Sequence, residues 1–313
     1  MTATTAPRTQ DIVAATKPRK HRNVGSIGRR TILFAVPALV LYAFVLIVPT
    51  LRGAVFAFTD WDGLTPAFNW VGFANFGKVL SDPGSLTALL VTFVIAFSAT
   101  IVQNVIGLLL ALGVNSRIKS RNVLRALLFA PAVMTPVVTS FLWKYMLAPN
   151  GTINTLLGSL GLRSFEQSWL GSPTWALFSI VLVIVWQFSG YSMVIFLAGL
   201  QSVPEEVLEA ASMDGAGAFR RFWFVVRPLL APAITVNIML SVIGGLKQFD
   251  QVFILTGGGP GGATNTMSTL IYKNAFTYGE FGYSIAMALV LAILVAMISA
   301  LQYRALLKGE TRA

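Results

Sequence analysis

Side chains that could perform covalent or metal chemistry are scarce in this sequence. Cysteine is absent, and the single histidine is His21, in a polar and basic stretch. A hydrolase needs a nucleophile with a base, or a metal cluster, and no pair of carboxylates lies within an apolar segment. We therefore predict no catalytic residue, no metal site and no cofactor bound by this chain.

The residue types best suited to recognise a partner are concentrated in Ser202–Pro232, which mixes Glu, Asp, Arg, Gly and Pro between apolar segments. Ser202 and Glu205 have the spacing of a capping box, and Pro204 falls in a first helical turn, where its missing N–H costs nothing. The Asp-Gly pair at 214–215 predicts a helix stop. The stretch therefore predicts a short helix between these signals.

A second helical piece is expected over Ala216–Val226, where aromatic residues accompany Arg220 and Arg221 and Pro228 begins the next apolar segment. Taken alone, this pair of helices fits an amphipathic connector on a membrane surface as well as a partner-binding element. The composition, the charge distribution and the motifs of the remaining chain distinguish between these two interpretations.

The composition indicates a polytopic membrane protein. Of 313 residues, 55% are hydrophobic and 11% are charged, against about 25% charged in a soluble domain. Residues 1–30 are polar and basic and predict a disordered tail, and a short second tail follows at 307–313. Prolines at 37, 131 and 136 predict kinks that neighbouring helices repair. Segments long enough to cross the bilayer are predicted near 31–51, 86–114, 123–147, 174–200, 229–249 and 283–306.

The distribution of basic residues predicts the orientation. With six spans, seventeen of the 23 Lys and Arg residues fall on the side that carries both termini. Basic loops face the cytoplasm, so both termini and Ser202–Pro232 are expected there. The same bias accounts for the net charge of +11 through contact with anionic lipid, without nucleic acid as a partner.

The predicted spans contain no obvious energy source. A coupled secondary carrier usually buries ionisable residues near the bilayer midplane, but the mid-span polar residues here are uncharged, among them Gln103, Asn104 and Gln187. The glycine run at 256–262 lacks the Gly-Lys-Ser/Thr of a nucleotide-binding loop. A transporter of this sequence would need a partner that supplies energy at Ser202–Pro232. A self-contained carrier or channel stays as the alternative from another class.

Four ordered motifs resemble those of one transporter family. Residues 209–216, Glu-Ala-Ala-Ser-Met-Asp-Gly-Ala, followed by Phe222, Val225 and Pro228, resemble the EAA loop of permease subunits of ABC importers, in the variant of the carbohydrate-uptake (maltose/maltodextrin-type) permeases. Similar family segments occur at 71–76, 125–131 and 256–260. One departure is Arg227, where the family usually has an apolar residue.

The resemblance implies an all-α polytopic membrane protein with the ABC type I importer permease fold, six transmembrane helices and cytoplasmic termini, in a bacterial cytoplasmic (inner) membrane. It also implies a second, homologous permease subunit, two copies of a cytoplasmic ABC ATPase that binds ATP and Mg, and an extracytoplasmic solute-binding protein. The residues expected to couple to the ATPase are Glu209, Ala210, Ala211, Asp214, Gly215, Ala216, Phe222 and Pro228.

The resemblance also implies a solute path between helices. Matching positions fall on Tyr191, Ser241, Gly244, Gly245 and Gln248. An amide and an aromatic face suit a sugar, and the two glycines replace larger side chains of the maltose-type permease. The expected activity is therefore import of a carbohydrate, a disaccharide or an oligosaccharide, by alternating access. Glycerol-3-phosphate, which closely similar permeases carry, stays as the alternative solute.

Overall fold

The computed structural model describes residues 34–116 and 119–310. The chain divides into two units, Met1–Arg52 and Gly53–Ala313, of which the first is described from Phe34 onward. Within the described residues the structure is helical, with a single isolated antiparallel bridge between Thr59 and Trp70. The predicted tail at 1–30 lies outside the described residues, as do 311–313.

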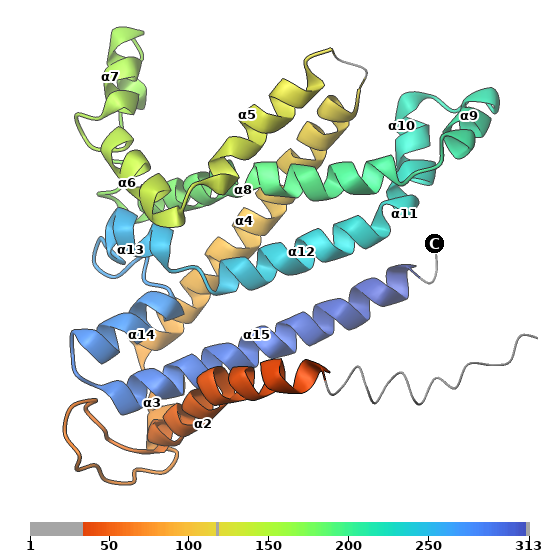
Figure 1. Cartoon of the computed structure of the whole chain (residues 1–313). Helices are drawn as coiled ribbons and strands as arrows, with labels where there is room; N and C mark the ends of the chain where they lie inside the picture. The colour runs from red at the N-terminus through yellow and green to blue at the C-terminus, as the bar shows by residue number, and fades with distance from the viewer. Residues whose placement is uncertain (1–33, 117–118, 311–313) are drawn as a thin grey trace, which may run out of the picture. The chain divides into compact units, whose positions relative to one another are not determined.

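The helices follow the apolar segments closely (Figure 1). Residues 307–310, expected to belong to a tail, continue the last helix. The regular elements are a π-helix at Ala43–Ile47, α2 Val48–Val55, a 3-10 turn at Phe56–Phe58, α3 Ala74–Ser81, α4 Pro83–Asn115, α5 Arg121–Val133, α6 Pro136–Met146, α7 Thr152–Ser159, a 3-10 turn at Arg163–Phe165, α8 Pro173–Gln201, α9 Glu205–Met213, α10 Ala218–Arg221, a π-helix at Phe222–Val226, α11 Arg227–Leu229, α12 Ala231–Leu246, α13 Asp250–Thr256, α14 Met267–Phe276 and α15 Phe281–Glu310.

Within the described ranges, four helices are long and apolar enough to cross a membrane, and the count reaches six if each of two bent pairs is one span. The four are Phe34–Phe58, Pro83–Asn115, Pro173–Gln201 and Phe281–Ala305. The first runs seven residues beyond its predicted end at 51, so Arg52, just outside the predicted span, lies within the helix.

Polar caps set where three of the long helical segments begin. Asp82, Thr135 and Ser172 each accept a backbone N–H from three residues further on, and each is followed by a proline at the first helical position. Such a cap satisfies a free N–H group, and proline has none to lose there. The sequence therefore specifies these helix starts locally.

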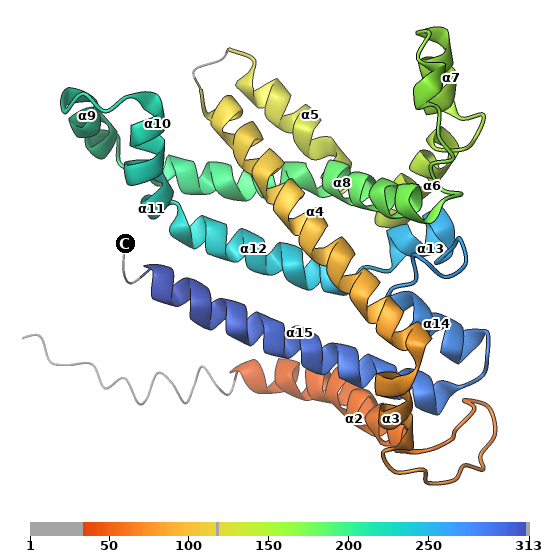
Figure 2. The same cartoon turned by 180° about the vertical axis from the view of Figure 1, so that it is seen from behind.

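Helix α4 is the centre of the packing in Gly53–Ala313. It contributes residues to each of the three buried apolar clusters, with Ala96 in the first, Ile95 in the second and Ala111 in the third. It contacts both α8 and α12, and Figure 2 shows it crossing these two helices. Close approach is possible because Gly107 of α4 lies against the side chain of Ser192 in α8.

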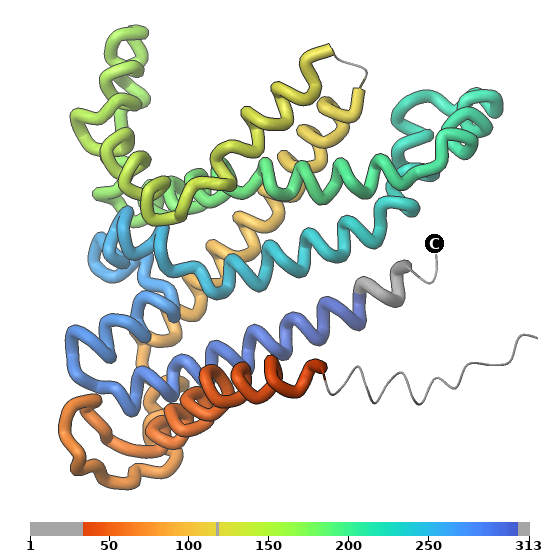
Figure 3. The backbone as a smooth tube through the Cα atoms, viewed as in Figure 1, coloured from red at the N-terminus to blue at the C-terminus, as the bar shows by residue number. Residues whose placement is uncertain are grey.

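The third predicted span is broken, which corrects the expected kinks at Pro131 and Pro136. Helices α5 and α6 meet at 94°, and the tube in Figure 3 turns sharply at this point. Proline at the start of α6 cannot continue the hydrogen bonding of α5. The carbonyl of Met134, freed at the break, accepts a hydrogen bond from Gln187 Nε2 of α8 at 2.9 Å. Repair by a neighbouring helix is confirmed, but a gentle kink is not.

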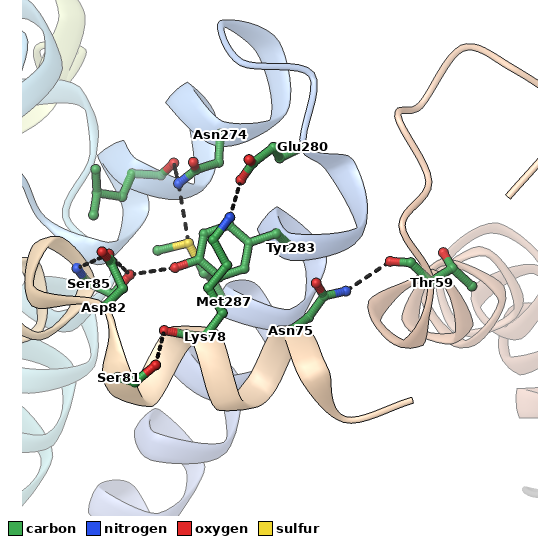
Figure 4. Close-up of polar contacts among 11 residues, drawn as sticks. Thr59, Asn75, Lys78, Ser81, Asp82, Ser85, Asn274, Glu280, Tyr283 and Met287 are labelled. Atoms are coloured by element: carbon green, nitrogen blue, oxygen red, sulfur yellow. Dashed lines mark hydrogen bonds and ion pairs between the residues drawn. The ribbon is translucent and has the colours of Figure 1, made fainter. Parts of the chain in front are cut away.

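A group of polar contacts ties α3 and the start of α4 to α15 (Figure 4). Lys78 Nζ lies 2.7 Å from Glu280 Oε2 and 4.0 Å from the centre of the Tyr283 ring. The Tyr283 hydroxyl lies 2.8 Å from Ser85 Oγ. Asp82 accepts the Ser85 N–H, which holds the pKa of the Asp82 carboxyl below its usual range. These contacts fix one end of α15 against α3 and α4.

Candidate functional site

Helix α9 begins differently from the sequence prediction. Its N-cap is Pro204, and no side chain caps the first turn. The predicted capping box of Ser202 and Glu205 is therefore wrong. The prediction that Pro204 lies inside the first turn is also wrong. The Ser202 hydroxyl instead donates to the carbonyl of Gly199 at 2.7 Å. Because α8 extends to Gln201, Ser202 is the C-cap of that helix and its hydroxyl is used there.

The predicted helix stop at 214–215 is confirmed. Asp214 is the C-cap of α9, and Gly215 takes a φ of +75°, which favours glycine. The N–H of Ala216 donates back to the carbonyl of Ala211 at 3.0 Å, which satisfies a carbonyl in the last turn of α9. The chain therefore leaves α9 in a sharp, locally specified turn.

The second helical piece starts two residues later than predicted and continues further. It comprises α10, a π-helical turn and α11, from Ala218 to Leu229, and α12 follows at an angle of 71°. Arg221 Nη1 donates to Ser212 Oγ at 2.8 Å, which fastens α10 to α9. The Arg227 guanidinium lies 4.5 Å from the centre of the Trp223 ring. This cation–π contact gives the unusual arginine a structural partner.

The predicted coupling residues lie together on α9–α11 and are accessible to different degrees. Figure 1 shows α9 and α10 at one end of α8. A shallow cleft of about 460 Å³ beside α9 is lined by Glu205, Leu208, Glu209, Ser212, Met213 and Arg221. Exposed positions are Glu209, Ala210, Asp214 and Gly215, and half-buried positions are Ala211, Ala216, Phe222 and Pro228. This surface offers carboxylates next to small residues, which leaves room for close approach of another chain.

A second hollow lies between helices α4, α5, α8 and α12. It is a cavity of about 370 Å³, and all five residues predicted to lie on a solute path line it: Tyr191, Ser241, Gly244, Gly245 and Gln248. The other lining residues are Ala99, Gln103, Ala132, Ile184, Phe188 and Leu240. None of the lining residues is charged. The structure thus brings the predicted set together in one apolar cavity with a few amide and hydroxyl groups.

Gln103 is the polar lining residue that the sequence prediction missed. Its Nε2 donates to Ser192 Oγ at 2.9 Å and to Ser241 Oγ at 3.2 Å, and Asn104 Nδ2 donates to the same Ser241 oxygen at 3.1 Å. The available signal was an amide in the middle of an apolar span, where polar groups are costly. These bonds join α4, α8 and α12 at the cavity wall.

The two lysines nearest the cavity in sequence do not reach it. Lys144 Nζ donates to the carbonyl of Ile254 at 2.9 Å, and Lys247 is exposed. Neither lines the cavity. Among the described residues, no group of three or more His, Asp or Glu side chains is arranged to hold a metal ion. The cavity can therefore offer hydrogen bonds and aromatic faces, and no fixed charge.

Comparison with known proteins gives a consistent family match. Residues 103–306 match the family model described as binding-protein-dependent transport system inner membrane component. The chain is 34% identical over 277 residues to the multiple sugar-binding transport system permease protein MsmF of Streptococcus mutans, with 88% of this chain and 95% of MsmF covered. It is 34% identical to the trehalose/maltose transport system permease protein MalF of Thermococcus litoralis, with 84% and 88% covered.

A third relative and a solved structure agree. The lactose transport system permease protein LacF of Rhizobium radiobacter is 32% identical, with 87% of this chain and 92% of LacF covered. The crystal structure of a bacterial ABC transporter involved in the import of the acidic polysaccharide alginate contains a chain with a TM-score of 0.78, 21% identity, and coverage of 91% of this chain and 98% of that one. At that identity the similarity concerns the fold, which is the ABC importer permease fold.

Proposed function

Since this chain belongs to the family of binding-protein-dependent transport system inner membrane components, we propose that it is the membrane-embedded permease of an ATP-driven importer for a neutral disaccharide or oligosaccharide. The chain is a translocation subunit and not an enzyme. The names of MsmF, MalF and LacF, all of which refer to sugars, support carbohydrate as the solute class.

The observation that carries the proposal is the uncharged lining of the cavity between α4, α5, α8 and α12. The amides of Gln103 and Gln248 and the hydroxyl groups of Tyr191 and Ser241 stand among apolar residues and the Phe188 ring. Sugars are bound by such hydrogen-bonding groups together with aromatic faces. A phosphate ester would favour Arg or Lys, and neither lines the cavity, so glycerol-3-phosphate is the less favoured solute.

The energy for transport would enter through α9–α11. Much of this segment is exposed, and Arg221 joins α10 to α9 through Ser212, which supports movement of the segment as a unit. We assign docking of a cytoplasmic ABC ATPase to Glu209, Ala210, Ala211, Asp214, Gly215, Ala216, Phe222 and Pro228. The ATPase, present in two copies, would bind ATP and Mg, and this chain would bind no cofactor.

The complete importer would contain a second, homologous permease and an extracytoplasmic solute-binding protein. With each bent pair counted as one span, the chain crosses the cytoplasmic membrane six times, and the Lys and Arg bias supports cytoplasmic termini. ATPase closure would shift the permeases between inward-facing and outward-facing states, because each partner binds one of the two states more tightly.

The test is uptake of radiolabelled maltose, trehalose, lactose and raffinose by the native host, with the chromosomal copy of this chain intact or deleted. We expect uptake of at least one of these sugars to require the chain. Deletion of 209–215 should abolish both that uptake and co-purification with the ATPase. Uptake that persists after this deletion would contradict the coupling role.

A milder pair of variants controls for misfolding. Glu209→Lys should reduce ATPase co-purification, because the substituted side chain reverses the charge at an exposed position of α9. Glu166→Lys makes the same change at an exposed position between α7 and α8 and should leave co-purification unchanged. Equal effects of the two substitutions would argue against docking at α9.

A further inference from the structure

Three glutamine side chains form a continuous hydrogen-bonded relay beside the cavity. Gln248 Nε2 donates to Gln251 Oε1, Gln251 Nε2 donates to Gln187 Oε1 at 2.8 Å, and Gln187 Nε2 donates to the carbonyl oxygen of Met134 at 2.9 Å. The relay joins the loop after α12 to α13, α8 and the break between α5 and α6. Only Gln248 of the three amides lines the cavity.

The two inner members of the relay are fully buried. Gln187 and Gln251 both have 0% exposure, and a buried amide that loses a partner is costly. Each of them uses its oxygen as an acceptor and its nitrogen as a donor within the relay. Neither side chain can therefore turn over without breaking two hydrogen bonds in a place that water does not reach.

The direction of the relay is set at its far end. A side-chain amide can turn end for end, but a backbone carbonyl can only accept. The carbonyl of Met134 therefore requires the nitrogen of Gln187 to face it, which presents the Gln187 oxygen to Gln251. The same requirement passes through Gln251 to Gln248, whose nitrogen must donate and whose oxygen has no donor among the described residues.

We propose that Gln187 and Gln251 are positioning residues that hold the Gln248 amide with its oxygen available to the cavity, so that this point of the site accepts a hydrogen bond from a hydroxyl group of the solute. The inference rests on the proposed function, and it specifies one property of the solute. An anionic carboxylate or phosphate oxygen placed against the Gln248 oxygen would meet another acceptor and would be repelled. A neutral, hydroxyl-bearing solute meets the requirement.

The other amide in the cavity lacks this constraint. Gln103 Nε2 donates to the hydroxyl groups of Ser192 and Ser241, and a hydroxyl can donate as well as accept. Gln103 can therefore turn over without losing its partners. Only Gln248 has an orientation fixed through buried neighbours, which makes it the discriminating contact of the cavity.

The experiment compares uptake of the transported sugar with uptake of its set of monofluoro analogues, in which one hydroxyl at a time becomes a fluorine that cannot donate. In wild-type cells, one analogue should be transported about 10-fold to 100-fold less well, since a buried acceptor is left unpaired. The variants Gln251→Met and Gln187→Met break the relay with little change in side-chain length. In these variants, the difference in uptake between the parent sugar and that analogue should fall to within about 3-fold. Gln302→Met in α15 is the matched control and should keep the wild-type ratio.

The informative quantity is the ratio of uptake of the parent sugar to uptake of the analogue. The same solute-binding protein serves every variant, and a loss of folded protein lowers uptake of parent and analogue equally. The inference is overturned if wild-type cells discriminate against no analogue, or if the ratio in Gln251→Met and Gln187→Met equals that of wild type. If no sugar in the panel requires this chain for uptake, the proposed function itself fails.

Discussion

Gly245 of α12 lies directly against Ala96 of α4, and a Cβ atom on residue 245 would come within 2.8 Å of the Cα of Ala96. The preceding glycine, Gly244, also lines the cavity but has no atom within 4 Å of the position of its Cβ. Two adjacent glycines therefore have different reasons to be glycine. One allows two helices to touch, and the other leaves space in the cavity.

We expect Gly245→Ala to destabilise the protein relative to Gly244→Ala by about 1–3 kcal/mol, because the added methyl group forces α12 away from α4. The gain in helix propensity from glycine to alanine is common to both variants and cancels in the comparison. Thermal unfolding of the two purified proteins in the same detergent measures the difference. Equal unfolding temperatures would show that the α4–α12 contact adjusts without cost.

The residues of the cavity were expected from the family resemblance, and the relay beside the cavity was not. Ser241, Gly244 and Gly245 share one face of α12, and Gln248 lies just beyond the end of that helix. The contact of Gln187 with Gln251 joins positions 64 residues apart. The bond from Gln187 to the Met134 carbonyl uses a group that is freed at the 94° break between α5 and α6, which the prolines suggest only as a kink.

Local signals also misled where two helices compete for one residue. Ser202 has the spacing of an N-cap for α9, yet its hydroxyl bonds to the end of α8, because α8 runs to within three residues of α9 and the linker is too short for a separate cap. By contrast, the turn at Gly215 depends only on its own backbone conformation, and the sequence predicts it correctly.

The turn at Gly215 gives a second prediction. Gly215→Ala should weaken the end of α9 by about 1–2 kcal/mol, because alanine disfavours positive φ, whereas nothing lies within 4 Å to clash with a methyl group. Hydrogen exchange at the amide of Ala216, which bonds to Ala211, should speed up by about 5-fold to 30-fold. Gly215→Asn should be milder, since asparagine tolerates this conformation. An alanine variant as well protected as the asparagine variant would contradict the argument.

The link between α9 and α10 gives a third prediction. Arg221→Met removes the hydrogen bond to Ser212 and should raise exchange of the α9 amides by a few-fold, because a charged donor to a neutral partner contributes about 1.5–3 kcal/mol in a buried setting and less at this partly exposed one. Arg220→Met is the matched control, because Arg220 is exposed and its side chain makes no hydrogen bond within the described part of the chain. Comparable exchange in both variants would mean that Arg221 does not hold α9.

The loop between Asp60 and Asn69 gives a prediction on pH. Asp60 accepts the backbone N–H of Asn69 at 2.6 Å, and Asp62 accepts those of Leu64 and Thr65 at 3.0 Å and 2.8 Å. The backbone bond from Asn69 lowers the pKa of Asp60 below its ordinary value of 3.8. The backbone bond from Thr65 does the same for the pKa of Asp62. The ionised carboxylates therefore hold the loop closed.

The pKa of each carboxyl is lower in the folded loop than in the open one. Such a carboxyl stabilises the loop above pH 3.8, and this stabilisation is lost as the pH falls through the pKa that the carboxyl has in the folded loop. In lipid nanodiscs, the amides of Thr65 and Asn69 should thus be protected from hydrogen exchange at pH 7, and should lose that protection, after correction for intrinsic rates, as the pH falls below 3.8. Asp60→Ala combined with Asp62→Ala, which removes both acceptors, should remove the pH dependence and leave both amides poorly protected at neutral pH. Protection of Thr65 and Asn69 that does not change between pH 7 and the acid range would show that contacts other than the carboxylates close the loop.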